Sequence, residues 1–292
     1  MKDIPLLRHS VIAFLLAAFA PAGAAEKPGT LRILTSFYPV YIHALNVAGN
    51  MPGVEVANMA QPSAGCLHDY SITPGDLVRI SNADVFVVNG GGMESFMDKA
   101  MKHAPGIRVL DLSEGIPMLR ENNVVNAHVW LSVSNAIVQV RNLADGLSRI
   151  DPARAAAFRA NAEQYADKLR ALDARMRSGL SDLRTRDIVT FHEAFPYFAR
   201  AYGLNIAAAI AREPGSEPSA RELAGTVDII RKAGVKAIFA EPQYSSRAAQ
   251  VIARETGATV FALDPAVTGP PEPGAFIRIM EENLRELQKA LK

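Results

Sequence analysis

One long stretch, residues 151–184, most constrains how this chain can fold. After Asp151-Pro152, which is a helix start, no proline follows for more than 30 residues. Apolar residues recur at intervals of three or four from Phe158 to Leu183, as on one face of a helix. A single helix of this length would span about 45 to 50 Å. Two helices broken near residues 177–179 are the alternative. We predict one long connecting helix.

The parts of the chain on either side of this stretch alternate short apolar runs with helical segments. Runs of this kind are typical of buried parallel strands, and their alternation with helices indicates βαβ units. The predicted strands are residues 31–35, 54–58, 85–89, 108–112, 187–191, 205–210, 237–240 and 259–263. Two helices begin with capping boxes, one at Thr73 with Asp76 and one at Ser219 with Glu222.

These patterns predict an α/β fold of two lobes, each a parallel sheet flanked by helices, joined by the long helix. The predicted organisation is a signal peptide (1–25), an N-terminal lobe (26–150), the connecting helix (151–184) and a C-terminal lobe (185–292).

Three histidines and one aspartate stand at or just past the ends of apolar stretches. They are His68, His128, His192 and Asp264, and about 60 to 70 residues separate each from the next. That spacing excludes a small zinc finger and requires a site assembled by a large fold. Three neutral imidazoles and one carboxylate form a complete tetrahedral shell for zinc. The spacing alone leaves open that each histidine is a hydrogen-bonded core residue.

The predicted strands place two of these side chains. His192 and Asp264 directly follow strands of the C-terminal lobe, whereas His68 and His128 lie in loops of the N-terminal lobe. Ligands of open α/β sheets bind beyond the carboxyl ends of the strands. Two ligands from each lobe would put a metal site in the inter-lobe cleft.

Six short motifs occur in one order along the chain. They are residues 36–39 (SFYP), 68–76 (HDYSITPGD), 128–131 (HVWL), 191–198 (FHEAFPYF), 240–244 (AEPQY) and 263–265 (LDP). With them, the sequence from about Leu31 to the C-terminus resembles the zinc- and manganese-binding solute-binding proteins of ABC importers (cluster A-I), most of all the zinc-binding members. The resemblance implies that His68, His128, His192 and Asp264 bind the metal.

The resemblance also implies a function. The chain is expected to be a monomeric periplasmic protein and not an enzyme. It is expected to bind Zn²⁺, its transported ligand, with high affinity and to deliver it to an ABC permease and its ATPase in the inner membrane. Three imidazoles favour zinc, whereas manganese prefers more oxygen. The alternatives are a manganese or iron receptor of the same family and a zinc-dependent hydrolase, in which water would replace Asp264.

The sequence departs from the family pattern in two places. Residues 114–127 contain no histidine-rich loop, which leaves open that a metal chaperone loads the site. Around His128, Asn126-Ala127 and Ser132-Val133 stand where Asp-Pro pairs are usual, so the groups that orient this ligand are expected to differ.

The N-terminus has a basic start, an apolar run at residues 11–20 and small residues at 22–24, as a cleaved signal peptide does. No cysteine stands at the end of the run, where a lipid would be attached, so we expect a periplasmic protein without a lipid anchor. The net charge of +1, without a basic block, argues against nucleic acid or a membrane surface as partner.

The remaining candidate side chains receive structural interpretations. Cys66 is the only cysteine, so no internal disulfide can form. We interpret it as a buried structural thiol, with a metal ligand as the alternative. His43 is expected to pack in a helix and His103 to be solvated at a helix end. Glu241 ends a strand on the cleft side, where it could support a ligand.

Overall fold

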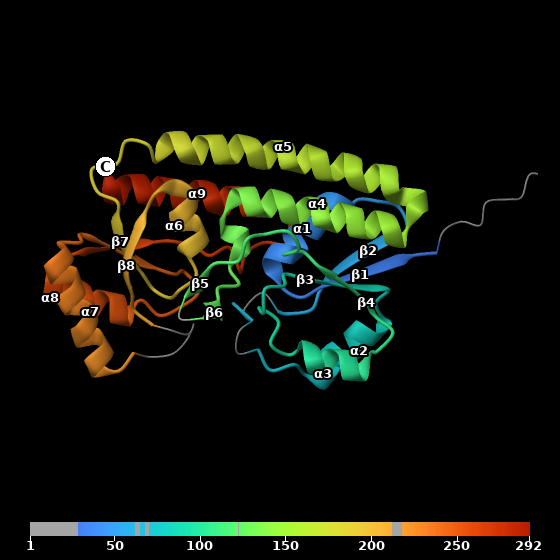
Figure 1. Cartoon of the computed structure of the whole chain (residues 1–292), viewed down its shortest axis with the longest axis horizontal. Coiled ribbons are helices and arrows are strands. Elements are labelled where there is room, and N and C mark those ends of the chain that lie inside the picture. Colours follow the sequence, from blue (N-terminus) through green and yellow to red (C-terminus); the bar gives the residue numbers. More distant parts are fainter. Residues whose placement is uncertain (1–28, 62–64, 68–69, 122, 212–217) are drawn as a thin grey trace, which may run out of the picture.

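The computed structural model describes residues 29–61, 65–67, 70–121, 123–211 and 218–292. The predicted signal peptide and His68 lie outside these residues. Figure 1 shows two sheets side by side beneath a layer of long helices.

The N-terminal sheet consists of four parallel strands in the order β2-β1-β3-β4. Its two central strands, β1 and β3, are largely buried between helices, as the sequence predicts for parallel sheets, whereas the edge strands β2 and β4 are only partly buried. The helix α1 packs on one side with α4 (Val133–Ile150) and α5 (Ala155–Gly179), and α2 and α3 lie on the other side (Figure 1). The elements are β1 (Leu31–Thr35), α1 (Tyr38–Ala48), β2 (Val54–Asn58), α2 (Pro74–Asn82), β3 (Val85–Val88), α3 (Met97–His103) and β4 (Arg108–Asp111).

The C-terminal sheet is also parallel, in the order β10-β9-β7-β8. Successive residues of β9 point to opposite faces. Ile238 belongs to a cluster with α7 and α8, whereas Phe239 belongs to the main core with α9. The elements are β7 (Asp187–Thr190), α6 (Pro196–Tyr202), β8 (Asn205–Ala209), α7 (Ala220–Ala233), β9 (Ala237–Ala240), α8 (Arg247–Thr256), β10 (Thr259–Ala262) and α9 (Ala275–Leu291).

The connecting helix is present and unbroken. It is α5 (Ala155–Gly179), preceded by a 3-10 turn at Pro152–Arg154, and it runs above both sheets (Figure 1). It packs against α4 (Val133–Ile150) and, farther along, against α9. The helix ends before the predicted residue 183, where α9 comes close: Gln288 donates a hydrogen bond to the Gly179 carbonyl (3.0 Å). The α/β class and the long helix are therefore confirmed, and the domain bounds stay a prediction.

Local sequence signals explain several helix starts. Both predicted capping boxes form: the Thr73 side chain accepts from the Asp76 backbone, and the Ser219 side chain accepts from the Glu222 backbone. Three short elements between the sheets were not predicted, because runs of two or three residues carry too little periodicity. They are β5 (Arg120–Glu121), β6 (Val124–Val125) and the 3-10 helix η2 (Val129–Leu131).

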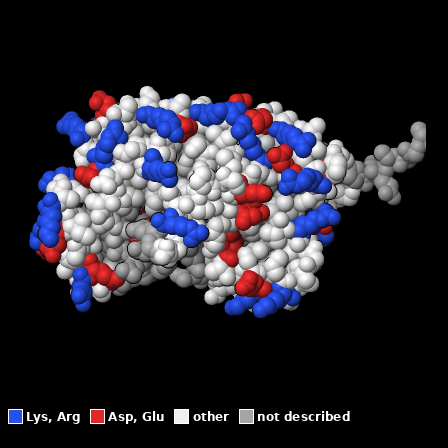
Figure 2. All heavy atoms as spheres, viewed as in Figure 1, with Lys and Arg blue, Asp and Glu red and all other residues white. Residues whose placement is uncertain are grey.

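The surface carries charges of both signs. Lys and Arg side chains are interspersed with Asp and Glu across most of the face in Figure 2, so this face presents no continuous basic surface. Within the described part of the chain, no helix combines the length and the apolar character that crossing a bilayer requires.

Candidate metal centre

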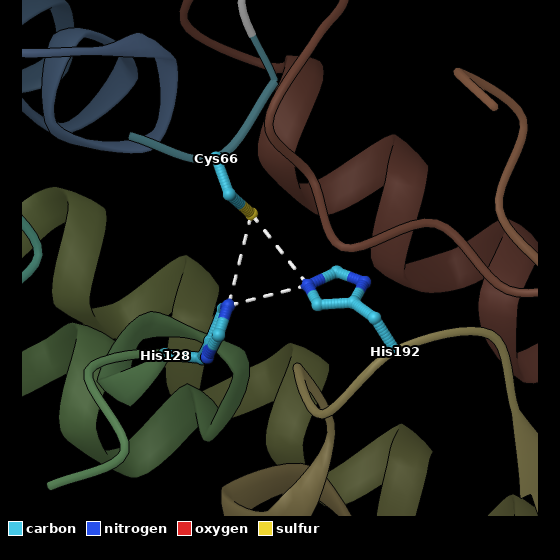
Figure 3. A group of neighbouring side chains, drawn as sticks. All are labelled: Cys66, His128 and His192. Carbon is cyan, nitrogen blue, oxygen red and sulfur yellow. Dashed lines mark hydrogen bonds between the residues drawn. The ribbon is translucent and has the colours of Figure 1, made fainter. Parts of the chain in front are cut away.

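Three buried side chains from distant parts of the chain meet at one place (Figure 3). They are Cys66, His128 and His192, with exposed fractions of 7%, 3% and 1%. The two imidazole Nε2 atoms are 3.4 Å apart, and the Cys66 Sγ atom is 3.7 Å from that of His128 and 3.8 Å from that of His192. Among the described residues, this is the group of histidine, cysteine and carboxylate side chains whose ligand atoms lie close enough to hold one ion.

His192 is positioned by two strands of the C-terminal sheet. It lies two residues after β7, and the Thr190 hydroxyl donates to its carbonyl (3.1 Å). On the ring, Nδ1 contacts the carboxylate of Glu241, which directly follows the neighbouring strand β9. Gln243 donates to the other oxygen of that carboxylate (3.1 Å). The carboxyl ends of β7 and β9 thus carry the ligand and the group that orients it.

His128 is oriented by a residue of its own loop. The side-chain oxygen of Asn126 accepts from the His128 backbone N–H (3.0 Å) and lies 3.1 Å from Nδ1 of the ring. The Asn126 amide in turn donates to the Glu193 carbonyl (2.8 Å), beside His192. Asn126 therefore does the work that an aspartate at this position would do, but as a neutral acceptor.

These contacts decide the protonation of both rings. A neutral imidazole carries its proton on one nitrogen, and an acceptor beside Nδ1 holds the proton there. In His128 and His192 the proton is therefore assigned to Nδ1, and the Nε2 lone pairs point toward one another. Two acceptors at this distance repel unless a proton or a cation lies between them. The arrangement suits a metal ion.

The two lobes are also linked around the site. Trp130, whose ring lies 5.2 Å from that of His128, donates from its indole nitrogen to the Pro265 carbonyl (2.8 Å), in the loop after β10. Trp130 is fully buried beside His128.

Cys66 is held by the C-terminal lobe. Gly65 has a φ of +66°, and a Cβ at that position would lie 2.5 Å from the Tyr244 hydroxyl. The Cys66 backbone also hydrogen-bonds the Tyr244 phenol oxygen. The Tyr244 ring stacks on Phe191, next to His192. A glycine is required at position 65 for both its backbone conformation and this close approach.

Asp264 lies two residues after β10, which ends one residue before the predicted strand end at residue 263. Its Oδ1 atom accepts from the Ala266 backbone (2.8 Å), and its own backbone is bonded in both directions by the Asn283 side chain (2.8 Å each). Burial, followed by the charge of Glu241, raises the pKa of Asp264 to about 6. The carboxylate does not belong to the group formed by Cys66, His128 and His192.

The other histidines match their structural interpretations. His43 lies fully buried in α1 between Tyr165 and Phe276, and burial lowers its pKa to about 4. His103 ends α3 and is exposed.

The structure thus brings together two of the four predicted ligands. Of the other two, Asp264 lies outside the group and His68 lies outside the described residues. Cys66 is buried, as interpreted from the sequence, but its thiol faces the two imidazoles. In the sequence, its position two residues before the predicted ligand His68 was the feature that could have indicated this role. Asn126 could have been found in the same way, because it lies two residues before His128.

Comparison with known proteins places the chain in a family. A family model described as zinc-uptake complex component A, periplasmic, matches residues 33–290. The zinc-binding protein AdcA of Streptococcus pyogenes serotype M6 is 30% identical over 290 residues, covering 90% of this chain and 56% of AdcA. The chain thus spans about half the length of that relative. The iron-binding protein YfeA of Yersinia pestis is 31% identical over 249 residues, covering 83% of this chain and 79% of YfeA.

A solved structure extends the similarity to the whole fold. The solute-binding protein FpvC of Pseudomonas aeruginosa, in complex with Mn²⁺, has a TM-score of 0.81 at 33% identity and covers 89% of this chain and 98% of FpvC. The two parallel sheets and the long helix occur together with a family match over nearly the whole described chain. The chain belongs to the family of periplasmic zinc-uptake components, which are solute-binding proteins of metal import.

Proposed function

We propose that this chain binds zinc outside the cytoplasm and delivers it to the permease and ATPase of an ABC importer. The observation that carries the proposal is the pair of buried imidazoles, whose Nε2 atoms lie 3.4 Å apart while an acceptor lies beside each Nδ1. Ligating histidines are oriented in this way in zinc sites, where the second ring nitrogen donates to a carboxylate or carbonyl group.

The proposed ligands are the four predicted from the sequence: His68, His128, His192 and Asp264. Burial of the Asp264 carboxyl opposes its ionisation, and a bound cation would stabilise the charged form. In this proposal the two C-terminal ligands, His192 and Asp264, each follow the end of a strand.

Zinc is favoured over manganese and iron because imidazole suits borderline ions, whereas manganese prefers oxygen ligands. The similarity to FpvC with Mn²⁺ and to the iron-binding YfeA makes a manganese or iron receptor the second candidate. We further propose that the protein is a monomeric periplasmic receptor rather than an enzyme, released by cleavage after residue 25. Fractionation and N-terminal sequencing of the secreted protein test that location.

The function is tested by metal analysis of protein purified without added metal, followed by competition titrations with zinc and manganese. We expect His68→Ala, His128→Ala and His192→Ala each to lower zinc affinity by more than about 100-fold. Loss of a group that only hydrogen-bonds a ligand already lowers metal affinity by about 10- to 100-fold. His103→Ala, which replaces an exposed histidine, is the matched control and should bind like the wild type.

Two results would contradict the proposal. Zinc binding that survives loss of both His128 and His192 would move the site elsewhere. Tighter binding of manganese than of zinc by the wild type would favour the second candidate. We expect the zinc-loaded protein to show negligible hydrolysis of ester and phosphate substrates, which separates a receptor from a zinc hydrolase.

A further inference from the structure

We propose that the Cys66 thiolate is a direct ligand of the transported ion, so that the site selects thiophilic cations. This inference rests on the proposed function and changes its ligand set, because Cys66 would occupy one of the four tetrahedral positions. The thiol is buried, lies against both imidazoles and comes from a separate segment of the N-terminal lobe (Figure 3).

The size of the triangle formed by the three ligand atoms supports this assignment. In a tetrahedral zinc site, Zn–N bonds of about 2.05 Å and a Zn–S bond of about 2.3 Å put two nitrogens about 3.3 Å apart and sulfur about 3.6 Å from each nitrogen. The corresponding distances here are 3.4 Å between the nitrogens, and 3.7 and 3.8 Å from sulfur to nitrogen. Each edge is within about 0.2 Å of the size that one zinc ion imposes.

The direction of the ligand atoms agrees with their spacing. Figure 3 shows the Sγ atom of Cys66 directed at the ring nitrogens that are left without a proton once Asn126 and Glu241 hold Nδ1. All three atoms therefore face one point. A packing role for the thiol would not explain why two imidazole lone pairs are directed at it.

The loop that carries Cys66 is held by contacts with the C-terminal lobe. The glycine conformation at Gly65, the close approach of the Tyr244 hydroxyl and the hydrogen bond to the Cys66 backbone together set the place of the sulfur. Because Tyr244 also stacks on the residue before His192, the same side chain positions two members of the group.

A Cys–His–His set leaves one tetrahedral position for a fourth ligand. On binding, the thiol loses its proton to solvent and the thiolate neutralises one of the two charges of the ion. Soft thiolate sulfur binds Zn²⁺ and Cd²⁺ well and binds Mn²⁺ poorly. The thiolate would therefore raise the preference for zinc over manganese beyond what histidines provide.

X-ray absorption of the zinc-loaded full-length protein tests the ligand directly. We expect a sulfur shell at about 2.3 Å from zinc in the wild type and its absence in Cys66→Ser. In competition titrations, Cys66→Ser should lower the ratio of zinc to manganese affinity by at least about tenfold. His103→Ala is the control and should leave both readouts unchanged.

Because Cys66 is the only cysteine, thiol chemistry gives a second readout that needs no variant. Saturating zinc should slow alkylation of the thiol in the wild type by at least about tenfold. A zinc-loaded wild type with nitrogen and oxygen neighbours only, or alkylation unaffected by bound zinc, would overturn the inference and leave the proposed function intact. A wild type that binds no zinc would instead overturn the proposed function.

Discussion

The carboxylate behind His192 offers a sharp test of how the site holds its metal. Glu241 is buried, with an exposed fraction of 2%, and contacts His192 Nδ1, while Gln243 donates to its other oxygen. Glu241→Gln preserves the shape of the side chain and an acceptor oxygen but removes the charge. The hydrogen bond that orients the ring then changes from charge-assisted to neutral.

The size of the effect follows from this change. Hydrogen bonds to charged groups contribute about 1.5 to 3 kcal/mol and neutral ones about 0.5 to 1.5 kcal/mol, so the loss is about 1 to 1.5 kcal/mol. Since 1.4 kcal/mol corresponds to a factor of ten, we expect zinc affinity to fall about tenfold. The expected value lies at the lower end of the 10- to 100-fold typical of such groups.

The assay is a competition titration against a chelator of known zinc affinity, with melting temperature and circular dichroism as checks of folding. Glu255→Gln is the matched control, because it makes the same change at a side chain with an exposed fraction of 63% on α8 in the same lobe. Zinc affinity equal to wild type in Glu241→Gln, with the fold intact, would refute the argument that this carboxylate orients the ligand.

Other predictions follow from the same geometry. Zinc affinity should fall as pH drops from about 6.5 to 5, because protons compete for imidazoles with a free pKa of about 6.5; titrations across this range check it. Zinc at 100 times its Kd should stabilise the fold by about 2.7 kcal/mol and raise the melting temperature, and an unchanged melting temperature would contradict a preformed site. Burial raises the pKa of Asp264 from 3.8 to about 6. Protonation of this carboxyl therefore contributes stability to the folded state, which is fully present below about pH 4 and is lost as pH rises through 6. Asp264→Asn should therefore stabilise the metal-free protein at pH 7.5 by up to about 3 kcal/mol in urea unfolding, and a gain that persists at pH 3.5 would contradict this cause. Trp130→Phe should cost the metal-free fold about 1 to 2 kcal/mol through its lost bond to the Pro265 carbonyl, again measured by urea unfolding.

Much of the fold could be predicted because its causes are local. The strand β1 was predicted with the bounds that the structure has, since four of its five residues are buried and apolar or β-branched, and only Arg32 is exposed. The capping box at Thr73 and Asp76 acts within four residues, so its sequence pattern suffices to start α2. The long helix was predicted from its periodicity, but its end was not, because α9 from the far end of the chain contacts Gly179 there.

The candidate site likewise has a part that could be predicted from the sequence and a part that could not. The local sequence shows that His192 follows a strand. A residue beyond the carboxyl end of a parallel strand lies where ligands of such sheets bind, independently of the rest of the chain. The partners of that residue are not local. Glu241 reaches His192 because β9 lies beside β7. The thiol of Cys66 meets His128 and His192 because the two lobes pack with Gly65 against Tyr244. Sequence alone determined which side chains could bind a metal. Only the packing of two lobes decided which of them face one another, because that depends on contacts between residues 60 to 180 positions apart.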